Sequence, residues 1–134
     1  MTVEPLLSSR NANMTRERFE ALVAEALASL PSEILERMDN VAVTVAYWPS
    51  HAQLARAGVK PPHTLFGLYE GVPLTKRGAQ YGMVPPDRIT LFQGPLEATC
   101  RTLAAIREQV RRTVIHEIGH HFGMDEDRIR GLGY

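Results

Sequence analysis

Residues 116–126 read H-E-I-G-H-H-F-G-M-D-E and begin with an H-E-x-x-H pattern formed by His116, Glu117 and His120. On an α-helix, residues four positions apart lie on the same face, so the two histidines can bind one metal ion together. Glu117 lies beside them, where it can take a proton from a water that the metal activates. The pattern fixes only three positions, so its helical context decides its interpretation.

The surrounding sequence predicts a long helix over Leu96–Phe122, which contains no proline and only Gly119 as a glycine. At about 100° of rotation per residue, four residues form one apolar stripe: Leu103, Ile106, Val110 and Val114. The same count places three arginines on the opposite, exposed face: Arg101, Arg111 and Arg112. The motif therefore lies near the end of an amphipathic helix.

Glu117 falls on the centreline of that apolar stripe. A lone ionised carboxylate there costs roughly several kcal/mol unless it is paired, and a nearby divalent cation removes the cost. The alternative is a core cluster of histidine and glutamate satisfied by neighbouring protein groups, or a helix end that frays. We favour the metal, with His116 and His120 as ligands and Glu117 as the catalytic general base.

The residues after the helix can supply a third ligand. Gly123 can adopt a positive φ and end the helix, so the chain can turn back toward the histidines. Glu126 then stands at the last position of H-E-x-x-H-x-x-G-x-x-E, and three protein ligands with one open position are typical of catalytic zinc. Asp125 and Asp127 are alternative ligands, and all three acids can instead cap a short terminal helix.

The other histidines have weaker claims to a metal. His121 points about 100° away from His120, so it is expected in the core or behind the ligands rather than on the metal. His51 and His63 lie in loop-like or mixed contexts.

The bulk composition predicts a soluble protein with one domain over residues 14–134 and a frayed tail over residues 1–13. The 15 basic and 15 acidic residues balance, which argues against a nucleic-acid or membrane-surface partner. No secretory signal or stretch of about 20 apolar residues is visible. Cys100 is the single cysteine, so no intrachain disulfide can form, and a cytoplasmic location is expected.

The order of predicted elements is α, α, β, β, β, α, which indicates an α+β domain with a small sheet covered by helices. Thr15 can cap a helix that runs to about Leu30, and Pro31 starts a shorter helical segment that ends near residue 40. Strands are predicted from residue 41 to 48, from 64 to 70 and from 89 to 92.

Two features are candidates for substrate binding. The long loop over Gly71–Arg88 is either a functional rim or an ordinary excursion. The short strand Ile89–Phe92 precedes the motif helix, and it is either an exposed sheet edge that could hold an extended peptide or an ordinary paired strand.

The chain resembles the small bacterial zincin-like metallopeptidases, or minimal zincins. Besides residues 116–126, the resemblance rests on T-L-F-G-L-Y-E-G-V-P-L-T at 64–75 and P-D-R-I-T-L-F-Q-G-P-L at 86–96. It implies a twisted sheet over an active-site helix, zinc bound by His116, His120 and Glu126, and Glu117 as the general base. Unlike larger zincins, the chain has no methionine turn after Glu126 and no room for a second subdomain.

Two functions are consistent with these observations. The first is a zinc-dependent peptide hydrolase acting on a peptide or protein substrate, with Tyr69, Tyr81 and His121 as candidates to stabilise the oxyanion. The second is a non-catalytic module that binds a peptide or protein and uses the metal for stability. The presence of Glu117 favours the hydrolase, because a purely structural metal site needs no general base.

Overall fold

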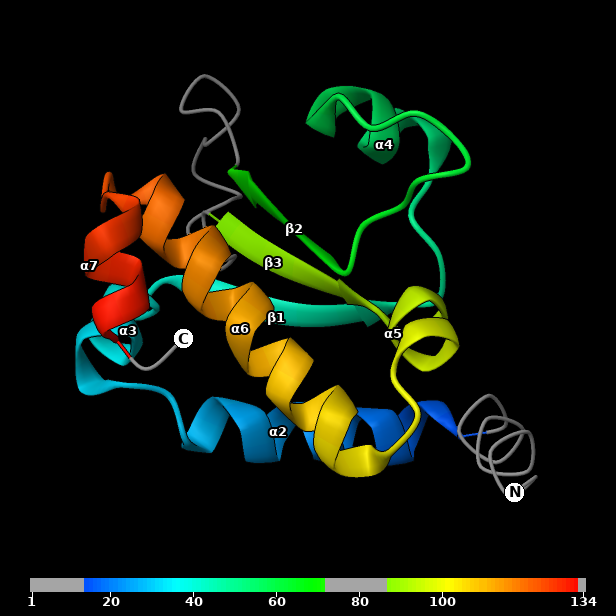
Figure 1. Ribbon diagram of the computed structural model, residues 1–134, viewed down its shortest axis with the longest axis horizontal. Coiled ribbons are helices and arrows are strands. Elements are labelled where there is room, and N and C mark those ends of the chain that lie inside the picture. The colour runs from blue at the N-terminus through cyan, green and yellow to red at the C-terminus, as the bar shows by residue number, and fades with distance from the viewer. Residues whose placement is uncertain (1–13, 72–86, 133–134) are drawn as a thin grey trace, which may run out of the picture.

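The computed structural model describes residues 14–71 and 87–132. In these ranges the chain forms a three-stranded mixed sheet covered by helices, as the sequence predicted (Figure 1). The predicted tail, residues 1–13, lies outside the described residues. Within the described ranges, no helix is both long and apolar enough to cross a membrane.

The N-terminal helices form where the sequence predicted them. Helix α2 spans Arg16–Ala28, and the Thr15 hydroxyl caps it by accepting a hydrogen bond from the Arg18 backbone amide. Its buried face is formed by four residues at helical spacing: Phe19, Leu22, Val23 and Ala26. Helix α3 spans Ser32–Arg37 and inserts Ile34 into the core. The two helices thus contribute one wall of the hydrophobic core.

The sheet has the strand order β1-β3-β2, so Ile89–Phe92 is not the candidate exposed edge but a paired strand, the alternative that the sequence left open. Strand β3 (Asp87–Phe92) lies in the middle, parallel to β1 (Val41–Ala46) and antiparallel to β2 (Gly67–Gly71). All four residues from Ile89 to Phe92 are buried, which suits a central strand covered on both faces. The edge nearest the motif helix is therefore β2.

The predicted long helix is two helices. Helix α5 spans Gln93–Thr99 and helix α6 spans Leu103–His121. Cys100 has an extended backbone between them, and the Thr102 hydroxyl caps α6 by accepting a hydrogen bond from the Ala105 amide. The predicted apolar stripe, which begins at Leu103 and ends at Val114, lies entirely in α6.

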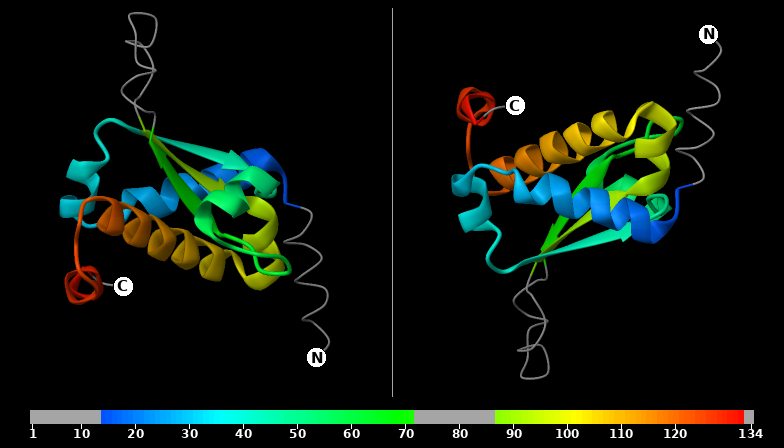
Figure 2. Two further views of the ribbon diagram at one scale, coloured as in Figure 1. Left: turned by 90° about the horizontal axis from the view of Figure 1, so that it is seen from above. Right: turned by 90° about the horizontal axis from the view of Figure 1, so that it is seen from below.

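Helix α6 packs beside α2 and across the strands β2 and β3 (Figures 1 and 2). Its predicted apolar stripe is largely correct, because Ile106, Val110 and Val114 are fully buried. The close approach to β2 requires Gly67, since a Cβ at that position would lie 2.8 Å from Thr113 Cγ2. This contact brings the edge strand alongside the helix that carries the motif.

One helix was missed by the sequence analysis. Helix α4 spans His51–Ala57, where we expected loop-like structure. Ser50 and Gln53 form a complete capping box at its start, and Gly58 ends it with a φ of 73°. These are the residues that nucleate and stop a short helix.

Candidate metal centre

The C-terminal end of α6 presents His116 and His120 on one face, as their spacing predicted, with ring centroids 5.3 Å apart. The helix ends where the sequence indicated, because Gly123 adopts a φ of 79°. The Met124 amide donates a hydrogen bond to the Gly119 carbonyl at 2.8 Å, which closes the turn. The chain then runs back over the end of α6.

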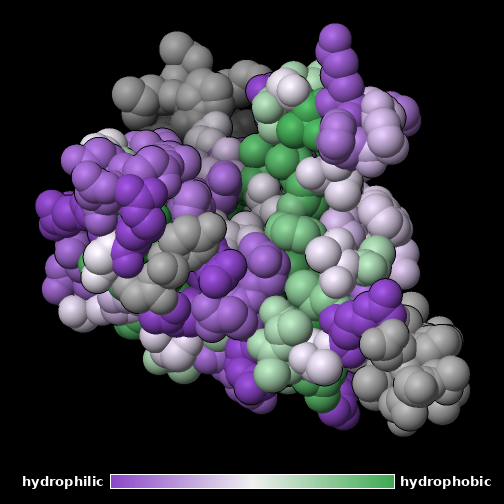
Figure 3. Space-filling view, viewed as in Figure 1, coloured by the Kyte–Doolittle hydropathy of each residue, from purple (hydrophilic) through white to green (hydrophobic). Residues whose placement is uncertain are grey.

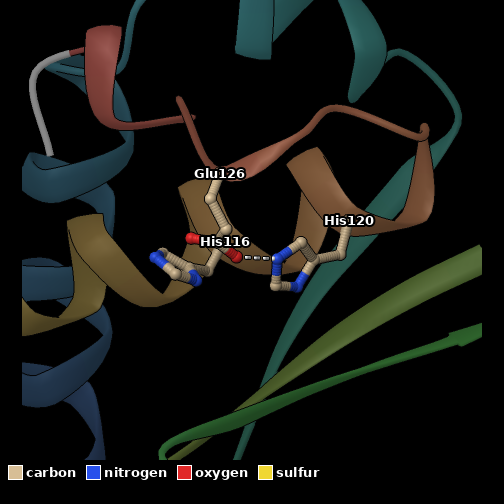
Figure 4. Close-up of side chains that lie close together, drawn as sticks. All are labelled: His116, His120 and Glu126. Atoms are coloured by element: carbon tan, nitrogen blue, oxygen red, sulfur yellow. Dashed lines mark hydrogen bonds and ion pairs between the residues drawn. The ribbon is translucent and has the colours of Figure 1, made fainter. Parts of the chain in front are cut away.

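This reversal leads into α7 (Glu126–Gly131), which carries Glu126, the predicted third metal ligand. Asp125 caps α7, with its side chain accepting from the Arg128 amide at 2.8 Å. Glu126 Oε2 accepts a hydrogen bond from His120 Nε2 at 2.6 Å. Asp127 forms an ion pair with Arg130 instead. Of the three acids, the structure thus directs Glu126 toward the histidines (Figure 4).

Helix α7 is held against α6 by close packing at Gly119. Ile129 of α7 is fully buried. A Cβ at Gly119 would lie 2.8 Å from both Ile129 Cδ1 and Ile129 Cγ1. The glycine inside the H-E-I-G-H segment therefore makes room for the side chain that fixes α7, and so it positions Glu126.

The three side chains form a donor group suited to one metal ion. His116, His120 and Glu126 each offer one ligand atom, and these three atoms lie within 4.8 Å of one another. Two imidazoles and a carboxylate are a known ligand set for catalytic zinc, with bonds of about 2.0–2.2 Å. The hydrogen bond from His120 lowers the pKa of Glu126, and the nearby charges of His116, His120 and Arg130 lower it further. Glu126 is therefore held as a carboxylate, the form that binds a cation.

Glu117 is fixed by the edge strand rather than by the ligands. The Tyr69 backbone amide donates a hydrogen bond to Glu117 Oε1 at 2.9 Å. This contact joins residues that are 48 positions apart, so the sequence did not show it. It gives the partly buried carboxylate a polar partner beside the two histidines.

His121 belongs to a separate cluster and points away from the ligands, as predicted, but it is exposed and does not lie in the core. Its ring stacks on Tyr69, with centroids 3.9 Å apart and planes 21° apart. The Tyr69 hydroxyl donates to Asp87 Oδ2 at 2.5 Å, and His121 Nε2 lies 3.8 Å from the same oxygen. This cluster supports the part of β2 that holds Glu117. Tyr81 and most of the predicted rim loop, Gly71–Arg88, lie outside the described residues.

A cleft of about 260 Å³ lies directly beside the donor group. Residues 64–67 form one wall, and five α6 residues form the other: Gln109, Arg112, Thr113, His116 and Glu117. On the face seen in Figure 3, apolar surface gathers between the side chains over α6 and those around α4. Arg112 lies on the exposed face, as predicted, but its place in a cleft with Gln109 and Thr113 was not predicted. Thr113, Arg112 and Gln109 precede His116 by three, four and seven positions, and this helical spacing could have identified them as neighbours of His116.

Comparison with known proteins identifies the family. The family model for zincin-like metallopeptidases matches residues 38–134, so the chain belongs to this family, as its motifs suggested. None of the curated proteins matches the chain. A solved structure of a conserved hypothetical protein from Thermus thermophilus is similar, with 19% identity and a TM-score of 0.54. The match covers 87% of this chain and 98% of that one, and it supports the fold alone.

Proposed function

We propose that this protein is a zinc-dependent peptide hydrolase, with zinc bound by His116, His120 and Glu126. The observation that carries the proposal is the convergence of these three donor atoms within 4.8 Å, beside Glu117. A set of three protein ligands leaves one position for water or substrate, which distinguishes a catalytic zinc site from a closed structural one.

When bound, zinc would lower the pKa of a water molecule and polarise the carbonyl of the scissile bond. Glu117 is the residue that moves the proton. Its Oε1 is held by the Tyr69 amide, so Oε2 is the oxygen assigned to take the proton of the attacking water. The same oxygen then passes that proton to the nitrogen of the leaving amine.

The edge of β2 supplies a surface for an extended substrate. Leu68 and Glu70 pair with β3, and the Phe66 carbonyl accepts from the Phe92 amide. Backbone groups alternate in direction along an antiparallel strand, so those of Gly67 and Tyr69 face the opposite side, toward α6. The Tyr69 amide donates to Glu117, so a peptide bound at this edge would gain main-chain hydrogen bonds from Gly67, and these do not depend on the peptide's sequence. We therefore assign peptides or proteins as substrates.

The test combines metal analysis with turnover. Protein purified without chelator and supplied with zinc is expected to hold about one zinc per chain. It should cleave peptides from a mixed library, and a chelator should stop cleavage. Glu117→Gln should retain zinc but lose cleavage, because an amide cannot accept the proton. Glu25→Gln is the matched control. It changes an exposed residue of α2 that pairs with Arg107 of α6, and it should retain both zinc and cleavage.

Two results would contradict the proposal. Zinc content that stays near zero after zinc is supplied would exclude the site. Stoichiometric zinc with no cleavage of any library peptide would instead favour a binding module in which the metal serves stability.

A further inference from the structure

The cleft beside the metal centre has a polar wall built from α6. Gln109, Arg112 and Thr113 lie on the helix face that carries His116, because they precede it by seven, four and three positions. Gln109 Nε2 donates to Thr113 Oγ1 at 3.3 Å. These side chains begin one turn from a metal-binding histidine, so a substrate group in the cleft would lie close to the reacting bond.

Arg112 determines the charge of this cleft. It is the one lysine or arginine among the described residues that line it. Its Nε lies 3.5 Å from Glu108 Oε2, and both side chains are about half exposed. Such a surface pair contributes only about 0–1 kcal/mol, so a substrate carboxylate can compete for the guanidinium. Glu117 and Glu126 balance the charge of a divalent ion, so Arg112 is the group in the cleft lining that can attract an anionic part of the substrate.

We infer that the cleft binds a carboxylate of the substrate next to the scissile bond, and that Arg112 determines this specificity. The inference rests on the proposed hydrolase function and names its substrate class. An extended chain advances about 3.3–3.6 Å per residue. The cleft begins at His116 and Glu117, so the carboxylate belongs to a residue within about two positions of the cleaved bond. The planar guanidinium can bind it through two parallel hydrogen bonds.

The experiment compares peptides that differ only in Glu or Gln at each position near the cleavage site. With both peptide ends blocked, the parent is expected to show a kcat/KM about tenfold higher for Glu at one position, the low end for a charge-assisted hydrogen bond. Arg112→Gln should reduce this ratio to about one. Arg112→Glu should reverse the preference, so that the Gln peptide is cleaved faster than the Glu peptide. High salt should weaken the preference, because the cleft is open to solvent.

Arg111→Gln is the matched control. Arg111 is the neighbouring arginine on α6, but it lines a different cavity with Glu25 and Arg107. Its replacement changes the net charge by the same amount, so it should preserve the Glu preference. Loss of the preference in Arg111→Gln to the same extent as in Arg112→Gln would show a general charge effect and overturn the inference.

The source of the carboxylate is distinguished by a second set of peptides. Peptides with a free C-terminus are compared with their amidated forms, with the terminus one or two residues from the cleaved bond. A preference for Glu in blocked peptides identifies an acidic side chain, whereas a preference only for the free acid identifies the terminal carboxylate. Equal cleavage of all these forms would overturn the inference while leaving the hydrolase proposal intact.

A binding measurement separates failure of the inference from failure of the proposed function. Fluorescent Glu and Gln peptides are titrated with zinc-loaded Glu117→Gln protein and with Glu117→Gln/Arg112→Gln. If the parent cleaves nothing, an Arg112-dependent preference for Glu peptides of about tenfold supports the cleft assignment, although hydrolysis fails. Equal binding of both peptides by both proteins would overturn the assignment.

Discussion

Replacement of Gly119 by alanine tests how α7 is positioned. The new Cβ would lie 2.8 Å from two carbons of Ile129. Ordinary carbon contacts are about 3.5–4.0 Å, so one group must move by about 0.7–1.2 Å. Ile129 is fully buried and β-branched, so rotation of its side chain is restricted. The helix that carries Glu126 is therefore expected to shift outward.

The effect on stability is the difference of two terms. Alanine gains about 1 kcal/mol over glycine inside a helix, and overpacking a core costs about 1–3 kcal/mol. The net loss in the free energy of unfolding is therefore about 0–2 kcal/mol. Zinc affinity is the more decisive readout. A displaced Glu126 should weaken binding by about 10–100-fold, as is typical when support for a ligand is lost.

The assay is a zinc titration against a competing chelator dye, with urea unfolding of the metal-free protein. Gly131→Ala is the control, because a Cβ there meets nothing within 4 Å, and it should leave zinc affinity unchanged. In the Gly119→Ala background, Ile129→Ala removes both clashing carbons, so the double variant should be less destabilised than the sum of the single variants. Wild-type zinc affinity in Gly119→Ala, together with a gain of about 1 kcal/mol, would refute the reasoning.

Two further predictions concern single carboxylates. Glu126→Ala should weaken zinc binding, whereas Asp125→Ala and Asp127→Ala should affect mainly α7; retention of zinc only in Glu126→Ala would exclude the proposed ligand. Burial raises the pKa of Glu97, which accepts a hydrogen bond from Gln93, so its contribution to stability is present at low pH and is lost as pH rises through the raised pKa. Glu97→Gln should therefore gain stability relative to the parent as the pH rises through the raised pKa of Glu97, as measured by urea unfolding of the metal-free proteins; a difference independent of pH would contradict this.

Local rules account for what the sequence predicted. The spacing of His116 and His120 places them on one helix face, and Gly123 provides the positive φ that returns the chain toward Glu126. The capping box of Ser50 and Gln53 was also visible in the sequence, although the helix it starts was not predicted.

Non-local contacts account for what the sequence did not predict. Strand order depends on pairing between distant segments, so β3 could not be placed in the middle from its own residues. The contact between Tyr69 and Glu117 likewise joins two elements that only the folded chain brings together. Arg112 lies on the exposed face, as predicted, but the sequence did not show that this face lines a cleft. Its Cα lies only about 40° from that of His116 on the helix, and its long side chain reaches the cleft.

The proposed function depends on one zinc ion bound by His116, His120 and Glu126 beside Glu117. The most direct measurement is an anomalous diffraction map, at the zinc edge, from crystals grown with one equivalent of zinc. We expect a single strong peak about 2.0–2.2 Å from one nitrogen of each histidine and one carboxylate oxygen of Glu126. A zinc peak bound by other residues, or no peak at these three side chains, would contradict it.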